Sequence, residues 1–220
     1  MLYLIATPIG HPDDLSLRAV KVLSEAEVII CEGTKETSKL LKHHQIKARK
    51  YELLNEHSKP EDLQTLADLC KTQTVALVTD CGTPGFCDPG ADLVRLCHQN
   101  NIPYTSLLGP SALMGIISLS GLRLDQFLFR GFLPAENEAR AMAWSRLKKT
   151  KATQGIAVVI LDTPYRLKKT MTELHTHFPD RECVLVLNLS QSDETILKGI
   201  PEKIIKNLPF EKAEFMVLIN

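Results

Sequence analysis

A glycine- and proline-rich stretch from residue 79 to residue 90 carries the strongest chemical signal in the sequence. It reads T-D-C-G-T-P-G-F-C-D-P-G and directly follows the apolar run V-A-L-V at 75–78, which predicts a buried parallel strand. The glycines let backbone amides approach a ligand or adopt positive φ, and the prolines stiffen the turn. Because ligands bind at the carboxyl ends of the strands in open α/β sheets, we interpret the stretch as a ligand-binding loop. An ordinary glycine-rich turn between a strand and a helix is the alternative.

Three further loops follow predicted strands and carry small, polar or charged residues. They are residues 7–10, 32–37 and 109–112, which follow the predicted strands 2–6, 28–31 and 102–108. In the second loop, Glu32, Thr34 and Lys35 offer a carboxylate, a hydroxyl and a cation to a substrate, unless Glu32 and Lys35 are a solvated surface pair. In the third loop, Ser111 predicts the N-cap of a helix at 113–119, where free backbone amides favour a ligand.

Strands and helices alternate along the chain, which predicts the α/β class. Asp13 and Asp14 predict the cap of a helix that ends near residue 26, and Asp88 followed by Pro89 predicts the start of a helix that ends at Gln99. Two more helices are predicted at 37–44 and 60–70. Because the composition turns polar at 120–125, we expect an N-terminal α/β domain at residues 1–123 and a C-terminal α/β domain at residues 124–220. The second domain is predicted to hold helices at 135–149 and from 167 onward, and strands at 127–132, 156–161, 184–189, 195–197 and 215–219.

The 220 residues carry a formal net charge of zero, which argues against a protein that binds polyanions through a global basic field. Contact with nucleic acid would therefore need local basic clusters. One cluster extends from His43 to Lys50, and a second surrounds Trp144 and includes Arg140 and Lys151. Such charge runs are more often solvated surfaces than nucleic-acid contacts, so both interpretations stay open.

The six cysteines form no ligand motif, and we expect reduced thiols without a metal. The chain opens with Met1, Leu2 and Tyr3, with no basic segment followed by a long apolar one, so we expect a cytoplasmic protein without membrane contact. His57 lies in a polar stretch without an evident partner, and it is a weaker catalytic candidate than the loop residues.

Four motifs stand in a recognisable order: T-P-I-G at 7–10, E-G-T-K at 32–35, D-x-G-T-P-G-x-x-D-P-G at 80–90 and G-P-S-A at 109–112. In this order they resemble the bacterial ribosomal RNA small-subunit methyltransferase I family, a part of the tetrapyrrole methylase superfamily, and the resemblance covers nearly the whole chain. It implies two α/β domains with S-adenosylmethionine in the cleft between them, and methylation of a cytidine 2′-hydroxyl in small-subunit ribosomal RNA. It also implies a homodimer, because members of the superfamily commonly dimerise.

The resemblance further implies which residues form the site. The expected cofactor-binding residues are Pro8, Asp80, Gly82, Thr83, Pro84, Gly85, Ser111, Ala112 and Leu161. A ribose hydroxyl is a poor nucleophile near neutral pH, so a base or hydrogen-bond acceptor would help, with Glu32 as the first candidate and Asp162 as the second. Lys35 and Arg166 are expected to position phosphates, and methyl transfer itself requires no metal.

The loops expected to contact the substrate depart from the family pattern, whereas the cofactor loops match it. The chain reads E-G-T-K at 32–35 where the family usually has E-D-T-R, L-D-T-P-Y-R at 161–166 where it has Y-E-S-P-H-R, and L-N-L-S-Q at 187–191 where it has R-E-L-T-K. Two alternatives to RNA methylation therefore stay open. One is methylation of a tetrapyrrole-like small molecule, and the other is cofactor binding without catalysis.

Overall fold

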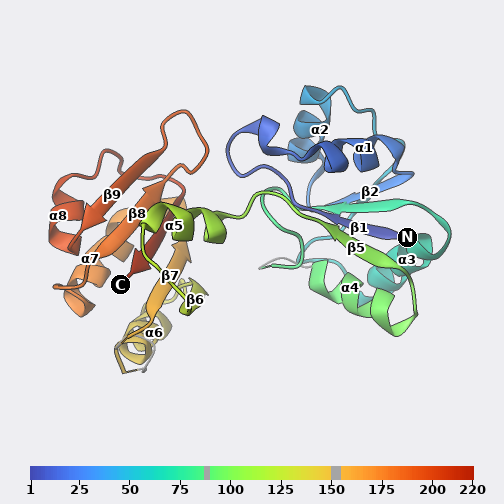
Figure 1. The fold of residues 1–220 in the computed structure, drawn as a ribbon. Helices are drawn as coiled ribbons and strands as arrows, with labels where there is room; N and C mark the ends of the chain where they lie inside the picture. The colour runs from blue at the N-terminus through green and yellow to red at the C-terminus, as the bar shows by residue number, and fades with distance from the viewer. Residues whose placement is uncertain (87–89, 150–154) are drawn as a thin grey trace. The chain divides into compact units, whose positions relative to one another are not determined.

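The computed structural model describes residues 1–86, 90–149 and 155–220, and it divides the chain into two compact units, Met1–Ser111 and Ala112–Asn220. Each unit is an α/β domain built around one five-stranded sheet (Figure 1), so the predicted fold class of two α/β domains is confirmed. The helix start predicted at Asp88 and Pro89, and Lys151 of the second basic cluster, lie outside the described residues.

The first unit contains a parallel sheet with the strand order β3-β2-β4-β1-β5. Its strands are β1 (Leu2–Ile5), β2 (Val28–Cys31), β3 (Tyr51–Leu53), β4 (Val75–Val78) and β5 (Tyr104–Leu107). Its helices are η1 (Pro12–Asp14), α1 (Leu17–Glu25), α2 (Thr34–His43), α3 (Pro60–Thr72) and α4 (Gly90–Gln99). Strands β2 and β4 are buried at every position, as their continuous apolar sequences predict for a sheet that is covered on both faces.

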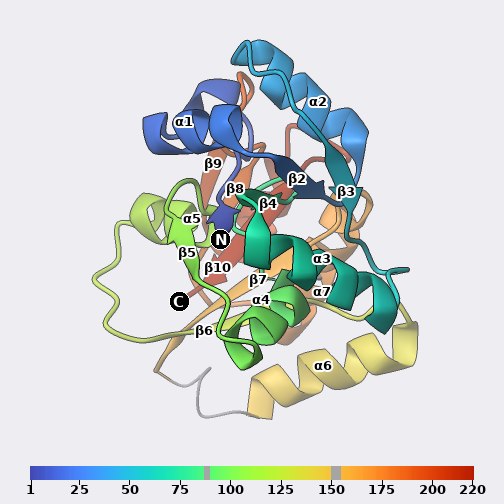
Figure 2. The ribbon, with the colours of Figure 1, turned by 90° about the vertical axis from the view of Figure 1, so that its right-hand side faces the viewer.

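Helices cover both faces of this parallel sheet (Figures 1 and 2). Helices α1 and α2 pack on the face that presents Ile5, Ile29 and Val78. Helices α3 and α4 pack on the opposite face, which presents Leu4 and Leu77. Because successive side chains of a strand point to opposite faces, each short apolar strand contributes to two cores.

The second unit contains a mixed sheet with the strand order β6-β7-β10-β8-β9, in which β6 and β7 are parallel and the other pairs are antiparallel. Its strands are β6 (Phe127–Phe132), β7 (Ala157–Asp162), β8 (Cys183–Leu187), β9 (Thr195–Gly199) and β10 (Phe215–Ile219). Its helices are α5 (Ala112–Ser120), α6 (Asn137–Lys149), η3 (Pro164–Arg166), α7 (Leu167–His177) and α8 (Pro201–Lys206). Helix α5 packs on one face, and α6, α7 and α8 pack on the other.

The first unit ends at Ser111, earlier than the boundary expected after residue 123. The reason is helix α5, whose fully buried Ile116 packs with Val159 and Leu218 of the second sheet. The polar composition at 120–125 marks the end of this helix, which belongs to the second unit. A change in composition locates a chain segment at the surface, but it does not say which core the preceding helix joins.

Two predicted helix starts are corrected by the structure. Helix α1 begins at Leu17 and is capped by Ser16, whose hydroxyl accepts a hydrogen bond from the Ala19 amide, whereas Asp13 and Asp14 lie in the preceding turn η1. Helix α2 begins at Thr34 instead of residue 37. Ser16 caps α1 because its side chain reaches the Ala19 amide, whereas α2 begins after Gly33 without a side-chain cap, so no capping residue in the sequence marks its start.

Candidate functional site

The four predicted ligand loops emerge from the carboxyl edge of the first sheet. Strand β1 lies between β4 and β5, and β2 lies on the other side of β4, so the loops that follow these strands are neighbours. The chain after β1 leads to α1 on one face, while the chain after β4 leads to α4 on the other. Neighbouring strands whose connections leave toward opposite faces form a topological switch point, the place where open α/β sheets bind ligands.

The loops after β1 and β4 are joined by a short antiparallel bridge between Thr7 and Gly82. The Thr7 amide donates to the Gly82 carbonyl at 2.8 Å, and the Gly82 amide donates to the Thr7 carbonyl at 3.1 Å. The hydroxyl of the buried Thr7 also donates to the Thr79 carbonyl at 3.1 Å. These bonds satisfy backbone groups that would otherwise be exposed where two parallel strands end, and they hold the two loops in one arrangement.

Two glycines of the loop after β4 adopt a backbone conformation that side chains disfavour. Gly82 has φ +84° and Gly85 has φ +82°. No atom lies within 4 Å of the position that a Cβ on Gly82 would occupy, so open space borders the loop at this point. The glycine requirement therefore comes from the backbone angle, and the open space leaves room for a bound ligand.

The loop after β5 packs closely against the loop after β1. A Cβ added to Gly109 would lie 3.1 Å from the Cβ of Ala6 and 3.2 Å from its carbonyl oxygen, so only glycine fits without displacement. The Thr83 hydroxyl donates to the Pro110 carbonyl at 3.5 Å, which adds a weak link between the loops after β4 and β5. Three of the four predicted loops are thus held against one another.

The structure places most of the predicted cofactor residues in these loops. Those of the first unit are Pro8, Asp80, Gly82, Thr83, Pro84, Gly85 and Ser111. Ala112 begins α5 and Leu161 lies in β7, so both belong to the second unit. Whether these residues bind S-adenosylmethionine stays a prediction, and their placement at the carboxyl edge of the first sheet is the structural argument for it.

Glu32 and Lys35 follow β2, the strand next to β4 in the first sheet. Glu32 is half-buried directly after β2, and Lys35 is an exposed residue in the first turn of α2 instead of the loop residue that was predicted. Partial burial raises the pKa of Asp80 above its ordinary value, and the Glu36 carboxylate raises it further. The Glu36 carboxylate in the first turn of α2 is therefore close enough to the loop after β4 to affect Asp80.

Asp162 lies in a buried network at the end of β7, and its side chain is fully buried. Its Oδ1 accepts from the Thr163 amide at 2.8 Å and from Arg166 Nη1 at 3.1 Å. Its Oδ2 accepts from Thr170 Oγ1 at 2.8 Å and lies 2.8 Å from Arg140 Nη2. A carboxylate offers about four acceptor positions, and four donors occupy them. The base role predicted for Asp162 stays a prediction, but these contacts are those of a positioning residue.

The network continues from Arg140 to Glu173 and Trp144. Arg140 is 1% exposed, its Nε donates to Glu173 Oε2 at 2.7 Å, and the Trp144 indole donates to the same oxygen at 2.9 Å. Two guanidiniums, Arg140 and Arg166, face the two carboxylates, so the network is formally neutral. In the sequence, Arg140 belongs to the second basic cluster, and nothing singled out Thr170 or Glu173 as its partners. The only signal was their i,i+3 spacing, which places both on one face of α7.

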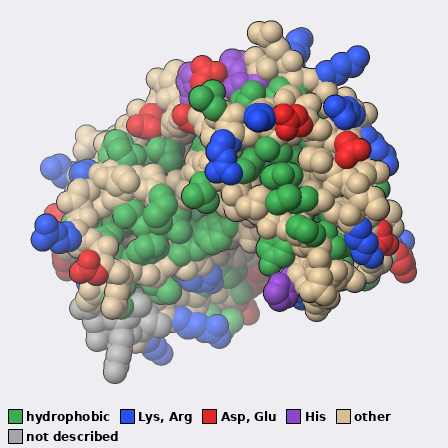
Figure 3. Space-filling view, turned by 45° about the vertical axis from the view of Figure 1, so that its right-hand side comes forward, with side chains coloured by type: hydrophobic (Ala, Val, Ile, Leu, Met, Phe, Trp, Pro, Cys, Tyr) green, Lys and Arg blue, Asp and Glu red, His purple; other side chains and the backbone are tan. Residues whose placement is uncertain are grey.

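The remaining sequence candidates lie at the surface. The His57 side chain is 85% exposed and its nearest acidic partner is Glu56, which fits a surface residue. On the face shown in Figure 3, Lys and Arg side chains are interspersed with Asp and Glu side chains. Within the described part of the chain, no helix is both long enough and apolar enough to cross a membrane.

Comparisons with known proteins point to one family. The family model for tetrapyrrole (corrin/porphyrin) methylases matches residues 1–204. The ribosomal RNA small subunit methyltransferase I of Coprothermobacter proteolyticus is 38% identical over 220 residues, which are 100% of this chain and 97% of that protein. The protein of the same name from a Synechocystis species is 36% identical over 226 residues, covering 100% of this chain and 78% of its own.

Solved structures of low sequence identity share the fold. A diphthine synthase superposes with a TM-score of 0.74 at 14% identity, covering 99% of this chain and 89% of its own. The uroporphyrin-III-C-methyltransferase from Thermus thermophilus superposes with a TM-score of 0.65 at 18% identity, covering 100% of this chain and 93% of its own. At these identities the similarity concerns the fold alone.

Proposed function

The chain belongs to the ribosomal RNA small subunit methyltransferase I family of tetrapyrrole methylases, and on this premise we propose that it transfers a methyl group from S-adenosylmethionine to small-subunit ribosomal RNA. The acceptor would be the 2′-hydroxyl of a cytidine, as the resemblance of the motifs implies. We also infer that the protein acts in the cytoplasm as a homodimer. The two relatives described above favour RNA over a tetrapyrrole-like acceptor. Both are named as ribosomal RNA methyltransferases, and each matches 100% of this chain.

The observation that carries the proposal is that the loops after β1, β4 and β5 are held against one another at the carboxyl edge of the first sheet. The bridge between Thr7 and Gly82, and the contact between Gly109 and Ala6, hold backbone amides and small side chains beside open space. A ligand as large as a nucleoside with a charged side chain needs such a preformed surface of backbone donors and small residues. The small residues and the open space beside Gly82 therefore fit S-adenosylmethionine, and the methyl transfer itself needs no metal.

In the proposed mechanism, the protein mainly positions the reacting groups. When bound, S-adenosylmethionine supplies an electrophilic methyl group on a sulfonium. The loops after β1, β4 and β5 would hold the cofactor rigidly, which favours the in-line geometry of a displacement. Glu32 would accept a hydrogen bond from the ribose hydroxyl, and Lys35 would pair with a phosphate at the start of α2. Asp162 would act indirectly, because it holds Arg166 and the turn after β7 in place.

A methyl-transfer assay with labelled S-adenosylmethionine tests the proposal. We expect the intact small subunit to accept more methyl groups than naked ribosomal RNA, because a protein with zero net charge and interspersed charges needs a shaped target instead of a long-range field. Tetrapyrrole precursors should accept none. Turnover on a tetrapyrrole but not on RNA would refute the RNA assignment, and cofactor binding without any turnover would refute the enzyme assignment.

Restoring the family pattern in the loop after β2 should raise activity on small subunits. Gly33 is the N-cap of α2, it has φ −148° and no side-chain cap, and no atom lies within 4 Å of its Cβ position. An aspartate therefore fits there as a better cap. Together with Lys35→Arg, which supplies a bidentate fork for phosphate, Gly33→Asp should increase the rate about 10-fold, the value of roughly one charge-assisted hydrogen bond.

The matched control for this double variant is Gly33→Asp with Lys39→Arg. Lys39 is an exposed lysine of the same helix and pairs with Glu36 at 2.8 Å. Its replacement by arginine also exchanges an ammonium for a guanidinium, but outside the motif at 32–35. We expect the control to behave like Gly33→Asp alone in the subunit assay. An equal gain in both double variants would show that the capped helix, and not a guanidinium at position 35, is responsible.

A further inference from the structure

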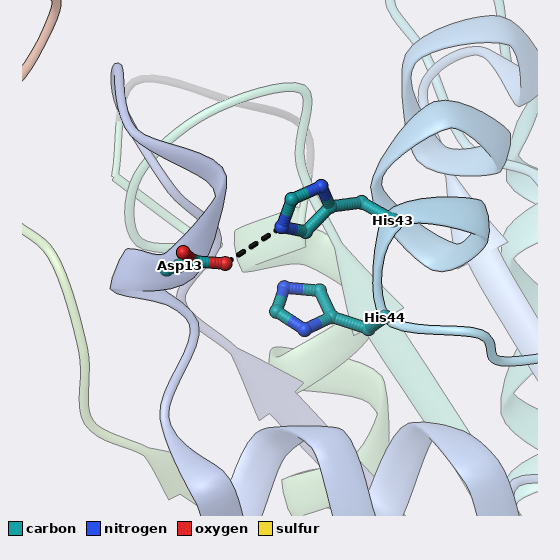
Figure 4. Close-up of side chains that lie close together, drawn as sticks. All are labelled: Asp13, His43 and His44. Atoms are coloured by element: carbon teal, nitrogen blue, oxygen red, sulfur yellow. Dashed lines mark hydrogen bonds and ion pairs between the residues drawn. The ribbon is translucent and has the colours of Figure 1, made fainter.

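Two histidines and one aspartate converge at the surface of the first unit. His43 is the last residue of α2, His44 follows it, and Asp13 lies in η1. Both imidazole rings extend from the end of α2 toward the Asp13 carboxylate (Figure 4). His43 Nε2 lies 2.6 Å from Asp13 Oδ1, and one ligand atom of each of the three residues lies within 4.8 Å of the others. We expected no metal from the spacing of the cysteines and from the chemistry of methyl transfer, and neither bears on this cluster of histidines and aspartate.

The donor set selects a class of ion. Two imidazole nitrogens and a carboxylate oxygen suit Zn²⁺ and similar divalent transition ions, whereas Mg²⁺ and Ca²⁺ prefer oxygen ligands only. With metal–ligand distances of about 2.0–2.1 Å, ligand atoms of a tetrahedral site lie about 3.3 Å apart. The observed spacing brackets this value, so small rotations of exposed side chains would create the site. The side chains of His43 and Asp13 are 45% and 65% exposed, which leaves the fourth position open to water.

A hydrogen bond already links η1 to the end of α2 before any ion binds. The His44 ring nitrogen Nε2 lies 2.9 Å from the Pro12 carbonyl, and the His43 and His44 rings meet edge to face at 4.9 Å between centroids. The cluster also lies at the carboxyl end of α2, where the helix dipole favours a cation. His11 adds a third imidazole nearby, with its Nδ1 3.9 Å from Asp13 Oδ2.

We propose that Asp13, His43 and His44 form a Zn²⁺-binding site that joins η1 to the end of α2. The nitrogen of His44 that faces the Pro12 carbonyl carries a proton, since a carbonyl only accepts. Binding of the ion through this nitrogen moves that proton to Nδ1, and the proton between His43 and Asp13 moves likewise or is released to solvent. The site lies beyond the proposed methyl transfer and supplies no step of it. Because η1 follows the 7–10 loop, the bound ion would stabilise the first unit and the segment that leaves its ligand edge.

Titration of the tag-free, chelator-treated chain with Zn²⁺ tests the proposal. We expect calorimetry to give one Zn²⁺ per chain for the wild type, and an affinity at least ~10-fold lower for His43→Gln and for Asp13→Asn. Zn²⁺ should also raise the melting temperature of the wild type and leave that of a His43→Gln, His44→Gln double variant unchanged.

His57→Gln is the matched control, because His57 is an exposed histidine 3.7 Å from Glu56 that belongs to no cluster of three potential metal ligands among the described residues. It should bind Zn²⁺ as the wild type does. Wild-type protein that binds no Zn²⁺, or a double variant that binds it as tightly as the wild type, would overturn the proposal. Since the Asp13 side chain is 65% exposed, Asp13→Asn provides a second readout if a histidine variant folds poorly.

Discussion

Gly82→Val is expected to lower the affinity for S-adenosylmethionine by about 10- to 100-fold, because a residue held in a disfavoured backbone region costs about 1–3 kcal/mol and a loop that relaxes away from it is rarely competent to bind. Gly82 has φ +84°, which a β-branched residue strongly disfavours. Its amide and carbonyl are both hydrogen-bonded to Thr7, so the backbone cannot change its φ angle without breaking these bonds. The open space around the Cβ position removes steric clash as the cause. Calorimetric titration with S-adenosylmethionine measures the effect.

Gly155→Val is the matched control for this prediction. Gly155 is exposed, its Cβ position is also open, and its φ lies outside the left-handed region. The same substitution there should leave cofactor affinity unchanged. A folded Gly82→Val variant with wild-type affinity would show that the loop after β4 does not form the cofactor surface.

Arg140→Met is expected to destabilise the second unit by about 3–5 kcal/mol, because it removes one partner of a buried ion pair and leaves charges without compensation. The substitution deletes the contacts of Arg140 with Asp162, Glu173 and Thr170, at 2.8, 2.7 and 2.6 Å. Urea denaturation followed by tryptophan fluorescence measures the loss. Trp144 is the only tryptophan of the chain and donates to Glu173, so its signal reports on the unit that is perturbed.

Lys206→Met is the corresponding control at the surface of the same unit. Lys206 pairs with Glu202 at 2.6 Å across one helical turn, but its side chain is 70% exposed. Such exposed pairs contribute only about 0–1 kcal/mol, so little change is expected. If Arg140→Met were as stable as the wild type, the buried network would not hold the turn after β7, and the positioning role of Asp162 would fall with it.

The network changes how activity losses at Asp162 must be interpreted. Asp162→Asn would replace one acceptor oxygen by an NH₂ group, which is itself a donor. This group would face donors of the network and leave them without an acceptor. A loss of activity in that variant would therefore combine instability with any catalytic defect. Glu32, half-buried directly after β2, is the carboxylate whose replacement tests a direct role in catalysis most cleanly.

The amino-acid sequence by itself determined the parallel strands of the first unit and the place of the loops that follow them. The runs at 28–31 and 75–78 are apolar at every position, and only a strand covered on both faces makes such a pattern favourable. The glycines and prolines after β4 marked a turn because they limit or extend the allowed backbone angles, which is a local property. Local signals of this kind are present in the sequence whatever the rest of the chain does.

Only the tertiary structure decided which charged residues meet. Arg140 had the appearance of a surface residue in a basic stretch, yet the packing of α6 against α7 and β7 buries it between Asp162 and Glu173. Asp13 and His43 likewise carry no pattern that relates them, and they meet because η1 and the end of α2 lie side by side. The assignment of α5 to the second unit follows the same rule. Side-chain partners that are distant in sequence depend on how helices pack on the sheets, and the periodicity of a segment reports which face is apolar but not what that face will contact.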